Sequence, residues 1–314
     1  MSVSPMPTTE WVGPARYLPP PAPRVQADGS KRYDGITYAV ALGYRPLQLD
    51  VWVPASPALP RLVVWIHGGA WMFGDRRYLP ETLRPNQLFE ELVAAGLAVA
   101  TVDYRHALEA QFPAQLHDAK AAIRYLRAHA DVLGVDTSRI GVWGESAGGH
   151  LAALVGLTGH NRDLEGAIGV LRQSSAVDAV VDWYGVADLS LQPRERRTPE
   201  VLAEIPPEML TPPEELMAGG RNEHTLAVAS PITYVAPGAP PFLLVHGTAD
   251  ITVPYEQSEV LAQALTAAGV PVRLVPIEGA DHIFNGHDDI DGVVRLSVDY
   301  LAEALLPARQ PHSS

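Results

Sequence analysis

Cysteine is absent from the 314 residues of this chain. Its absence excludes disulfide bonds and metal sites built from thiolates. The sequence also lacks an H-E-x-x-H zinc motif, a phosphate-binding glycine loop and a basic stretch interleaved with aromatic residues. An acidic cluster follows His287, but acidic residues at a helix start favour the helix dipole without any metal. We therefore expect no cofactor and no metal ion.

Long apolar runs are also missing. No stretch is long enough to span a bilayer, and the segment Met1–Pro23 lacks the apolar core of a signal peptide. We therefore expect no membrane association. The cytoplasm is the default location, and export by a route without a leader stays open.

Positive charge is scarce: 23 Lys and Arg stand against 36 Asp and Glu, a formal net charge of −13. An acidic surface disfavours nucleic acids and anionic membranes as partners. Hydrophobic residues make up 47% of the chain, which suits a globular protein with a large core. We expect a small-molecule partner. The oligomeric state stays open, a homodimer included.

Short apolar runs alternate with amphipathic segments along most of the chain. The runs predict strands at 62–66, 97–102, 139–143, 176–181, 241–245 and 272–277, and the segments predict helices at 86–95, 112–130, 150–155, 255–268 and 291–305. Residues 47–53 alternate as an antiparallel strand should. Strands alternating with helices predict an α/β fold whose mainly parallel central sheet is flanked by helices.

Proline divides the chain into parts. Residues 1–33 are proline-rich and predict an extended N-terminal arm, followed by one domain at 34–308 and a short tail at 309–314. Within the domain, residues 190–229 break the alternation with prolines and charges. So long an interruption is usually functional, and we interpret it as a small cap over the site.

One motif has the form G-x-S-x-G: Gly144-Glu145-Ser146-Ala147-Gly148. An apolar, β-rich run precedes it and a good helix former follows it. This strand–turn–helix context predicts that Ser146 is an exposed nucleophile at the apex of a strained turn.

A serine nucleophile needs a base and a group that orients the base. His282 lies on a loop between the last strand and the last helix, and Asp250 directly follows the strand at 241–245. Both positions are at carboxyl ends of strands, the edge that holds Ser146. Asp281 is the alternative acid, but side chains of loop neighbours usually diverge. The order Ser146, Asp250, His282 is that of the α/β-hydrolase sheet.

Acyl transfer also needs N–H donors for the negative charge on the former carbonyl oxygen. The turn after the strand at 62–66 offers Gly68, Gly69 and Ala70, where small side chains let backbone approach a ligand. Ala147, directly after the nucleophile, is the expected second donor. We expect His67 to hold this loop by hydrogen bonds. Aromatic and apolar residues beside these motifs are candidates for a substrate pocket: Trp71, Trp183, Tyr184, Ile283 and Phe284.

Together these motifs resemble the α/β-hydrolases of the carboxylesterase/lipase superfamily, near the hormone-sensitive-lipase-like esterases. The resemblance rests on His67-Gly68-Gly69-Ala70-Trp71, Asp103-Tyr104-Arg105, the serine motif, His246-Gly247-Thr248-Ala249-Asp250 and Gly279-Ala280-Asp281-His282. It covers about residues 47–305. The chain departs from that pattern at Ala70, often a third glycine, and at Glu145, often aspartate. The variant loop is also similar to feruloyl-esterase-like and kynurenine-formamidase-like relatives.

The resemblance implies a serine carboxylic-ester hydrolase that acts on short-chain or aryl esters through an acyl-enzyme. An arylformamidase-like amide hydrolase uses the same chemistry and stays open. A non-catalytic small-molecule receptor on a hydrolase fold is the alternative from another class, although such receptors typically lose the histidine that this chain keeps at 282.

Overall fold

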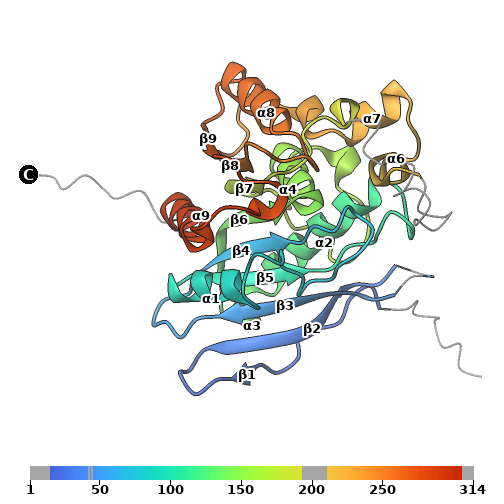
Figure 1. The fold of residues 1–314 in the computed structure, drawn as a ribbon. Coiled ribbons are helices and arrows are strands. Elements are labelled where there is room, and N and C mark those ends of the chain that lie inside the picture. Colours follow the sequence, from blue (N-terminus) through green and yellow to red (C-terminus); the bar gives the residue numbers. More distant parts are fainter. Residues whose placement is uncertain (1–14, 42, 44, 193–210, 306–314) are drawn as a thin grey trace, which may run out of the picture.

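A nine-stranded sheet forms the centre of the described chain (Figure 1). The computed structural model describes residues 15–305 apart from 42, 44 and 193–210. The sheet order is β1-β2-β3-β5-β4-β6-β7-β8-β9. The strands are β1 (Arg24–Val25), β2 (Lys31–Ala39), β3 (Leu47–Val53), β4 (Arg61–Ile66), β5 (Ala98–Val102), β6 (Asp136–Glu145), β7 (Ala179–Trp183), β8 (Phe242–Gly247) and β9 (Val272–Ile277).

The strands from β5 to β9 in that order pair in parallel, and only the pairs that involve β1, β2 and β3 are antiparallel. The predicted mainly parallel sheet is therefore confirmed. The connections between the parallel strands contain helices, which lie on both faces of the sheet. The α-helices are α1 (Gln87–Ala94), α2 (Ala114–Ala128), α3 (Ala130–Leu133), α4 (Ala147–Leu157), α6 (Pro213–Ala218), α7 (Glu223–Ala229), α8 (Glu256–Ala267) and α9 (Ile290–Leu305).

Two hydrophobic layers cover the sheet. Helices α1 and α9 pack on one face, and α2, α4 and α8 pack on the other (Figure 1). The central strand β4 contributes side chains to both layers. Leu62, Val64 and Ile66 pack in the α2–α4 layer, whereas Val63 and Trp65 pack in the α1–α9 layer. A strand buried on both faces must be apolar throughout, which is why 62–66 is a continuous apolar run.

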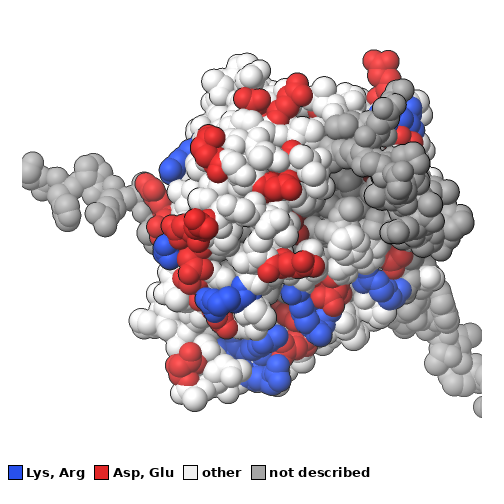
Figure 2. Space-filling view, viewed as in Figure 1, with Lys and Arg blue, Asp and Glu red and all other residues white. Residues whose placement is uncertain are grey.

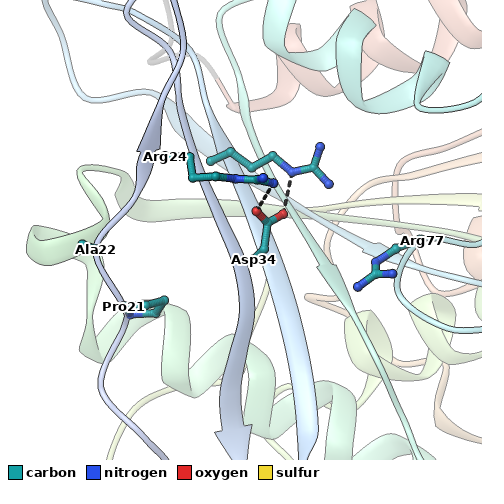
Figure 3. Close-up of a pocket in the computed structure, with 6 residues that line it drawn as sticks. Pro21, Ala22, Arg24, Asp34 and Arg77 are labelled. Atoms are coloured by element: carbon teal, nitrogen blue, oxygen red, sulfur yellow. Dashed lines mark hydrogen bonds and ion pairs between the residues drawn. The ribbon is translucent and has the colours of Figure 1, made fainter.

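The N-terminal region contains more strand than the sequence indicates. Residues 1–14 of the predicted arm lie outside the described residues, and the predicted boundary at 33 falls inside β2. The pairing of β2 with β3 shifts register between Tyr33 and Ile36. This irregularity breaks the period-two pattern and hides the strand from periodicity. Arg24 of β1 and Arg32 of β2 both pair with Asp34, beside a shallow hollow that Arg77 also lines (Figure 3).

The predicted cap at 190–229 is described only in part, because 193–210 lie outside the described residues, as does the predicted tail at 309–314. The described remainder contains α6 and α7, which pack against each other at one end of the molecule (Figure 1). The backbone N–H of Phe112 donates to Met217 O at 2.7 Å and joins α6 to the segment before α2. The cap interpretation stays a prediction.

Charge is unevenly spread over the face in Figure 2. Lys and Arg side chains gather over the part of the molecule that contains β1, β2 and β3, whereas acidic side chains also cover the upper part. Within the described residues, no helix combines the length and apolarity that crossing a membrane requires.

Candidate active site

Ser146 lies at the turn between β6 and α4. Its backbone is in a positive-φ conformation (φ 53°, ψ −119°), and its N–H donates to Trp183 O of β7 at 2.8 Å. The turn is tight because α4 starts against the end of β4: a Cβ on Gly148 would lie 2.1 Å from Ile66 O. The glycine therefore lets the helix start reach the sheet and places a strained serine at its carboxyl edge.

The loops after β6, β8 and β9 bring three predicted residues together. His282 Nε2 lies 3.1 Å from Ser146 Oγ, and His282 Nδ1 lies 2.7 Å from Asp250 Oδ2. A carboxylate accepts only, so Nδ1 carries a proton toward Asp250. In neutral His282, Nε2 is then free to accept the Ser146 hydroxyl proton. This geometry suits a nucleophile, a base and an orienting acid.

Asp250 is held from several sides. Its Oδ1 accepts the N–H groups of Thr252 and Val253 at 2.7 and 2.8 Å, and His246 Nε2 lies 3.3 Å from Oδ2. Burial alone would raise the pKa of this carboxyl. Hydrogen bonds from His246 and His282 outweigh burial and hold the pKa well below its usual range. Asp250 is therefore an ionised, fixed partner for the imidazole.

The alternative acid, Asp281, does not reach the imidazole ring. Its Oδ1 accepts the backbone N–H groups of His282 and Ile251 at 2.7 and 3.1 Å. It fixes the start of the turn that carries His282. The structure thus brings Asp250, and not Asp281, to His282 Nδ1.

The loop after β4, residues 67–71, is called the HGGAW loop below. Ala70 and Trp71 both have positive φ, 51° and 56°. Within the described part of the chain, no hydrogen bond joins the N–H of Gly69, Ala70 or Ala147 to another group. Gly68 is different and corrects the prediction: its N–H donates to Glu145 Oε1 at 2.7 Å, so this N–H is occupied and cannot serve as an oxyanion donor.

Glu145 is a residue whose role sequence reasoning missed. It is fully buried between the HGGAW loop and Tyr184, and a Cβ on Gly68 would lie 2.0 Å from its carboxylate. Burial raises the pKa of Glu145 to about 7, although nearby His282, when protonated, and the Gly68 N–H oppose the shift. A carboxylate inside a serine motif is the only signal that could have pointed to this bond.

His67 behaves as a structural residue, as predicted. Its ring stacks on Tyr104 with centroids 4.4 Å apart, and its Nδ1 lies 2.9 Å from Gly68 O. Burial lowers the pKa of His67 to about 3, so the ring is neutral. The Tyr104 hydroxyl reaches the carbonyls of His67 and Gly68 at 3.1 and 3.0 Å. These contacts hold the first half of the HGGAW loop.

The five predicted pocket residues have different surroundings. Trp183 is a correction: it is fully buried against Trp143, and its indole N–H donates to Ser297 Oγ at 2.9 Å, so it belongs to the α1–α9 layer. Strand alternation directs it away from the site. Trp71 is also buried, with its indole N–H on His150 Nδ1 at 3.2 Å.

The remaining pocket candidates lie around His282. The Tyr184 ring packs against the imidazole with centroids 4.8 Å apart, and Phe284 packs against Tyr184 at the same distance. Both rings are buried, whereas Ile283 is partly exposed and its carbonyl accepts the Thr82 hydroxyl at 2.7 Å. These residues hold the His282 turn in place.

Comparisons with known proteins place the chain among esterase-like sequences and structures. The profile of the BD-FAE family matches residues 49–265, and a profile described as TAP-like protein matches residues 224–312. Esterase LipC of Mycobacterium tuberculosis is 33% identical over 291 residues, which cover 90% of this chain and 66% of LipC.

Solved structures extend the comparison. A truncated carbohydrate esterase from gut microbiota superposes with a TM-score of 0.74 at 29% identity, over 87% of this chain and 95% of that one. Thermogutta terrifontis esterase 2 phosphorylated by paraoxon has a TM-score of 0.67 at 30% identity, over 88% and 96%.

The chain spans 66%, 55% and 54% of the first three curated relatives, and so less than their full length. The family profile nevertheless matches more than half of the chain, and the structural neighbours share its fold along almost their whole length. The chain belongs to the BD-FAE family of α/β-hydrolases.

Proposed function

We propose that the protein is a serine carboxylic-ester hydrolase that works through an acyl-enzyme intermediate. The observation that carries the proposal is a chain of two hydrogen bonds. One joins Ser146 Oγ to His282 Nε2 at 3.1 Å, and the other joins His282 Nδ1 to Asp250 Oδ2 at 2.7 Å. The esterase names of the relatives support it.

The reaction follows from these contacts. Ser146 Oγ attacks the ester carbonyl carbon while His282 Nε2 takes the hydroxyl proton, and the ionised Asp250 stabilises the resulting imidazolium. The tetrahedral intermediate collapses as His282 gives the proton to the leaving alcohol. A water molecule then attacks the acyl-enzyme in the same way, and the acid is released.

Negative charge on the carbonyl oxygen needs donors that are already in place. The N–H groups of Gly69, Ala70 and Ala147 are the proposed donors. Each such donor contributes about 3 kcal/mol to the transition state in well-studied hydrolases. Gly68 supports them indirectly, because its bond to Glu145 fixes the loop that carries Gly69 and Ala70.

We propose short-chain or aryl esters as substrates, with α6 and α7 as part of a small cap. Structures of Thermogutta terrifontis esterase 2 hold butyrate and propionate, which supports a short acyl site. Prolines and charges in 190–229 leave few clustered apolar residues for a broad lipid-docking face. We therefore expect no activation at an oil–water interface.

The test is kcat/KM on p-nitrophenyl esters of rising acyl length, with an aryl formamide beside them. We expect activity to rise through short chains and to stop rising near eight acyl carbons, since each methylene that fits adds up to about 0.8 kcal/mol of binding. A steady rise through long chains with a jump on emulsification would indicate a lipase. Fast formamide hydrolysis with poor ester hydrolysis would favour an arylformamidase.

A further inference from the structure

One buried histidine that takes no part in the proposed reaction connects α4, the HGGAW loop and the end of α7. His150 is the fourth residue of α4, is fully buried, and has a hydrogen bond on each ring nitrogen. Its Nδ1 accepts the Trp71 indole N–H at 3.2 Å, and its Nε2 lies 2.8 Å from Ala229 O. Trp71 ends the HGGAW loop, and Ala229 ends α7.

The two partners fix the tautomer of His150. An indole N–H can only donate and a carbonyl oxygen can only accept, so Nδ1 must be bare and Nε2 must carry the proton. Burial lowers the pKa of His150 to about 4, so the ring stays neutral near neutral pH. Both polar atoms of the ring are therefore satisfied in one orientation. This defines a rigid connection between the two partners.

Trp71 is the residue through which this connection reaches the proposed oxyanion donors. Ala70 and Trp71 have consecutive positive φ values, which L-residues adopt only when the surroundings hold them there. The Trp71 carbonyl accepts the Ala107 N–H at 2.7 Å, and its indole donates to His150. These two bonds hold Trp71 at both its backbone and its side chain, and so fix the direction of the neighbouring Ala70 N–H.

The other end of the connection lies in the proposed cap. Ala229 is fully buried, and the next residue, Ser230, accepts the Leu189 N–H at 2.9 Å and donates to Leu226 O at 2.7 Å. The end of α7 is thus anchored to the segment that follows β7. His150 joins that anchor to α4, whose first residue, Ala147, is the other proposed donor.

We propose that His150 is a positioning residue that holds the HGGAW loop in register with α4 and with the end of α7, so that both halves of the oxyanion site stay aligned. This inference rests on the proposed esterase function. The bond between His150 and Trp71 keeps the N–H of Ala70 aligned with that of Ala147, and the bond between His150 and Ala229 holds α7 in place.

Two substitutions separate the two bonds. The amide oxygen of asparagine is two bonds from Cβ, as Nδ1 is in histidine. His150→Asn therefore keeps an acceptor for the Trp71 indole N–H and loses the bond to Ala229 O. The amide nitrogen of glutamine is three bonds from Cβ, as Nε2 is in histidine. His150→Gln therefore keeps a donor for Ala229 O and loses the acceptor for the Trp71 indole N–H. Trp71→Phe removes the same bond as His150→Gln from the opposite side.

The readouts are kcat and KM on p-nitrophenyl butyrate, with the melting temperature of each variant. His150→Gln and Trp71→Phe should each lower kcat by about 10- to 100-fold with KM little changed, because a misplaced donor acts in the transition state. His150→Asn should keep kcat within about threefold of wild type and raise KM, because α7 shifts while the donors stay aligned.

Ser297→Ala is the matched control. It leaves the buried indole N–H of Trp183 without its acceptor, as His150→Gln does for Trp71, but it lies on α9 behind the sheet. It should lower the melting temperature comparably and leave kcat unchanged. If His150→Gln and Trp71→Phe lose no more kcat than Ser297→Ala, or if His150→Asn loses as much kcat as His150→Gln, the positioning role is wrong. An inactive wild type would instead overturn the esterase function, and this inference with it.

Discussion

At the scale of single residues, the proposed chemistry depends on one hydroxyl. Ser146→Ala removes the nucleophile but no buried contact, so we expect kcat to fall by about 10³-fold or more with an unchanged melting temperature. His282→Ala should cost about as much, and the double variant little more, because the residues act as a unit. A serine-directed phosphonate should label Ser146 alone, which mass spectrometry of tryptic peptides checks. Labelling at another serine would contradict the assignment.

Glu145 carries a second prediction at this scale, on stability. Its pKa is raised from 4.5 to about 7 by burial, so between these values the folded protein binds a proton that the unfolded chain has released. The stabilisation is complete below pH 4.5 and is lost as pH rises through 7. Glu145→Gln removes this dependence and can keep the bond from Gly68. Between pH 5 and 8, the free energy of unfolding of the wild type should therefore fall by up to about 3 kcal/mol relative to that of Glu145→Gln.

Urea unfolding of both proteins across this pH range measures the difference. The comparison with Glu145→Gln isolates the residue, because buried histidines such as His67 and His150 give the opposite slope in the same range and are present in both proteins. Parallel stability curves for the two proteins would mean that Glu145 titrates normally in the folded state.

At the scale of elements, the contact between the start of α4 and the end of β4 aligns the proposed donors. A Cβ on Gly148 would lie 2.1 Å from Ile66 O and 2.5 Å from His67 O, both backbone atoms that cannot move aside cheaply. Gly148→Ala should therefore destabilise the protein by about 2 kcal/mol or more and lower kcat, because Ala147 moves away from the HGGAW loop. Denaturation midpoints and kcat check both effects.

Gly292→Ala is the control for that prediction. It also lies in the first turn of a helix, α9, but the three atoms nearest to its Cβ would all belong to the side chain of Asp289. Alanine has a better helix propensity than glycine, which should stabilise the protein by about 1 kcal/mol. Loss of the hydrogen bond from the Gly292 N–H to Asp289 Oδ1 should destabilise it by about the same amount, so the two effects should cancel. Equal damage from both alanines would show that any glycine change in a helix start is harmful.

At the scale of the whole molecule, the antiparallel strands and the parallel strands share one sheet and should unfold together. Buried Arg76 links them: it lies 2.7 Å from Asp50 of β3 and 3.2 Å from Asp103 after β5. We expect far-UV circular dichroism and tryptophan fluorescence to report one coincident urea transition. Arg76→Ala removes the short ion pairs of two buried carboxylates and, among the described residues, leaves them only the 3.8 Å ion pairs with Arg77 and Arg45, so it should lower both transitions together by about 3 kcal/mol. Early loss of circular dichroism alone would mean that β1–β3 unfold separately.

Most of the parallel sheet can be predicted from the sequence alone. Strands buried on both faces, such as β4, must be continuously apolar, and the helices between them must carry an apolar stripe, so both are readable from periodicity. It also predicted that Ser146, Asp250 and His282 follow strands. Carboxyl ends of parallel strands share one edge, so that placement was enough to predict a common site.

The contacts between individual groups, in contrast, follow from the tertiary structure. His282 and Ser146 are 136 residues apart, and the sequence favoured Asp250 over Asp281 only by its place after a strand. The bond of Asp250 to His282 Nδ1, and that of Asp281 to backbone N–H groups, depend on loop conformations that no local pattern encodes. The same holds for Gly68, whose N–H is occupied by Glu145, for Trp183, which the strand direction turns into the core, and for His150 between Trp71 and Ala229. Hydrogen-bond partners are set by the positions of atoms in space, and residue types alone specify only what each group is able to donate or accept.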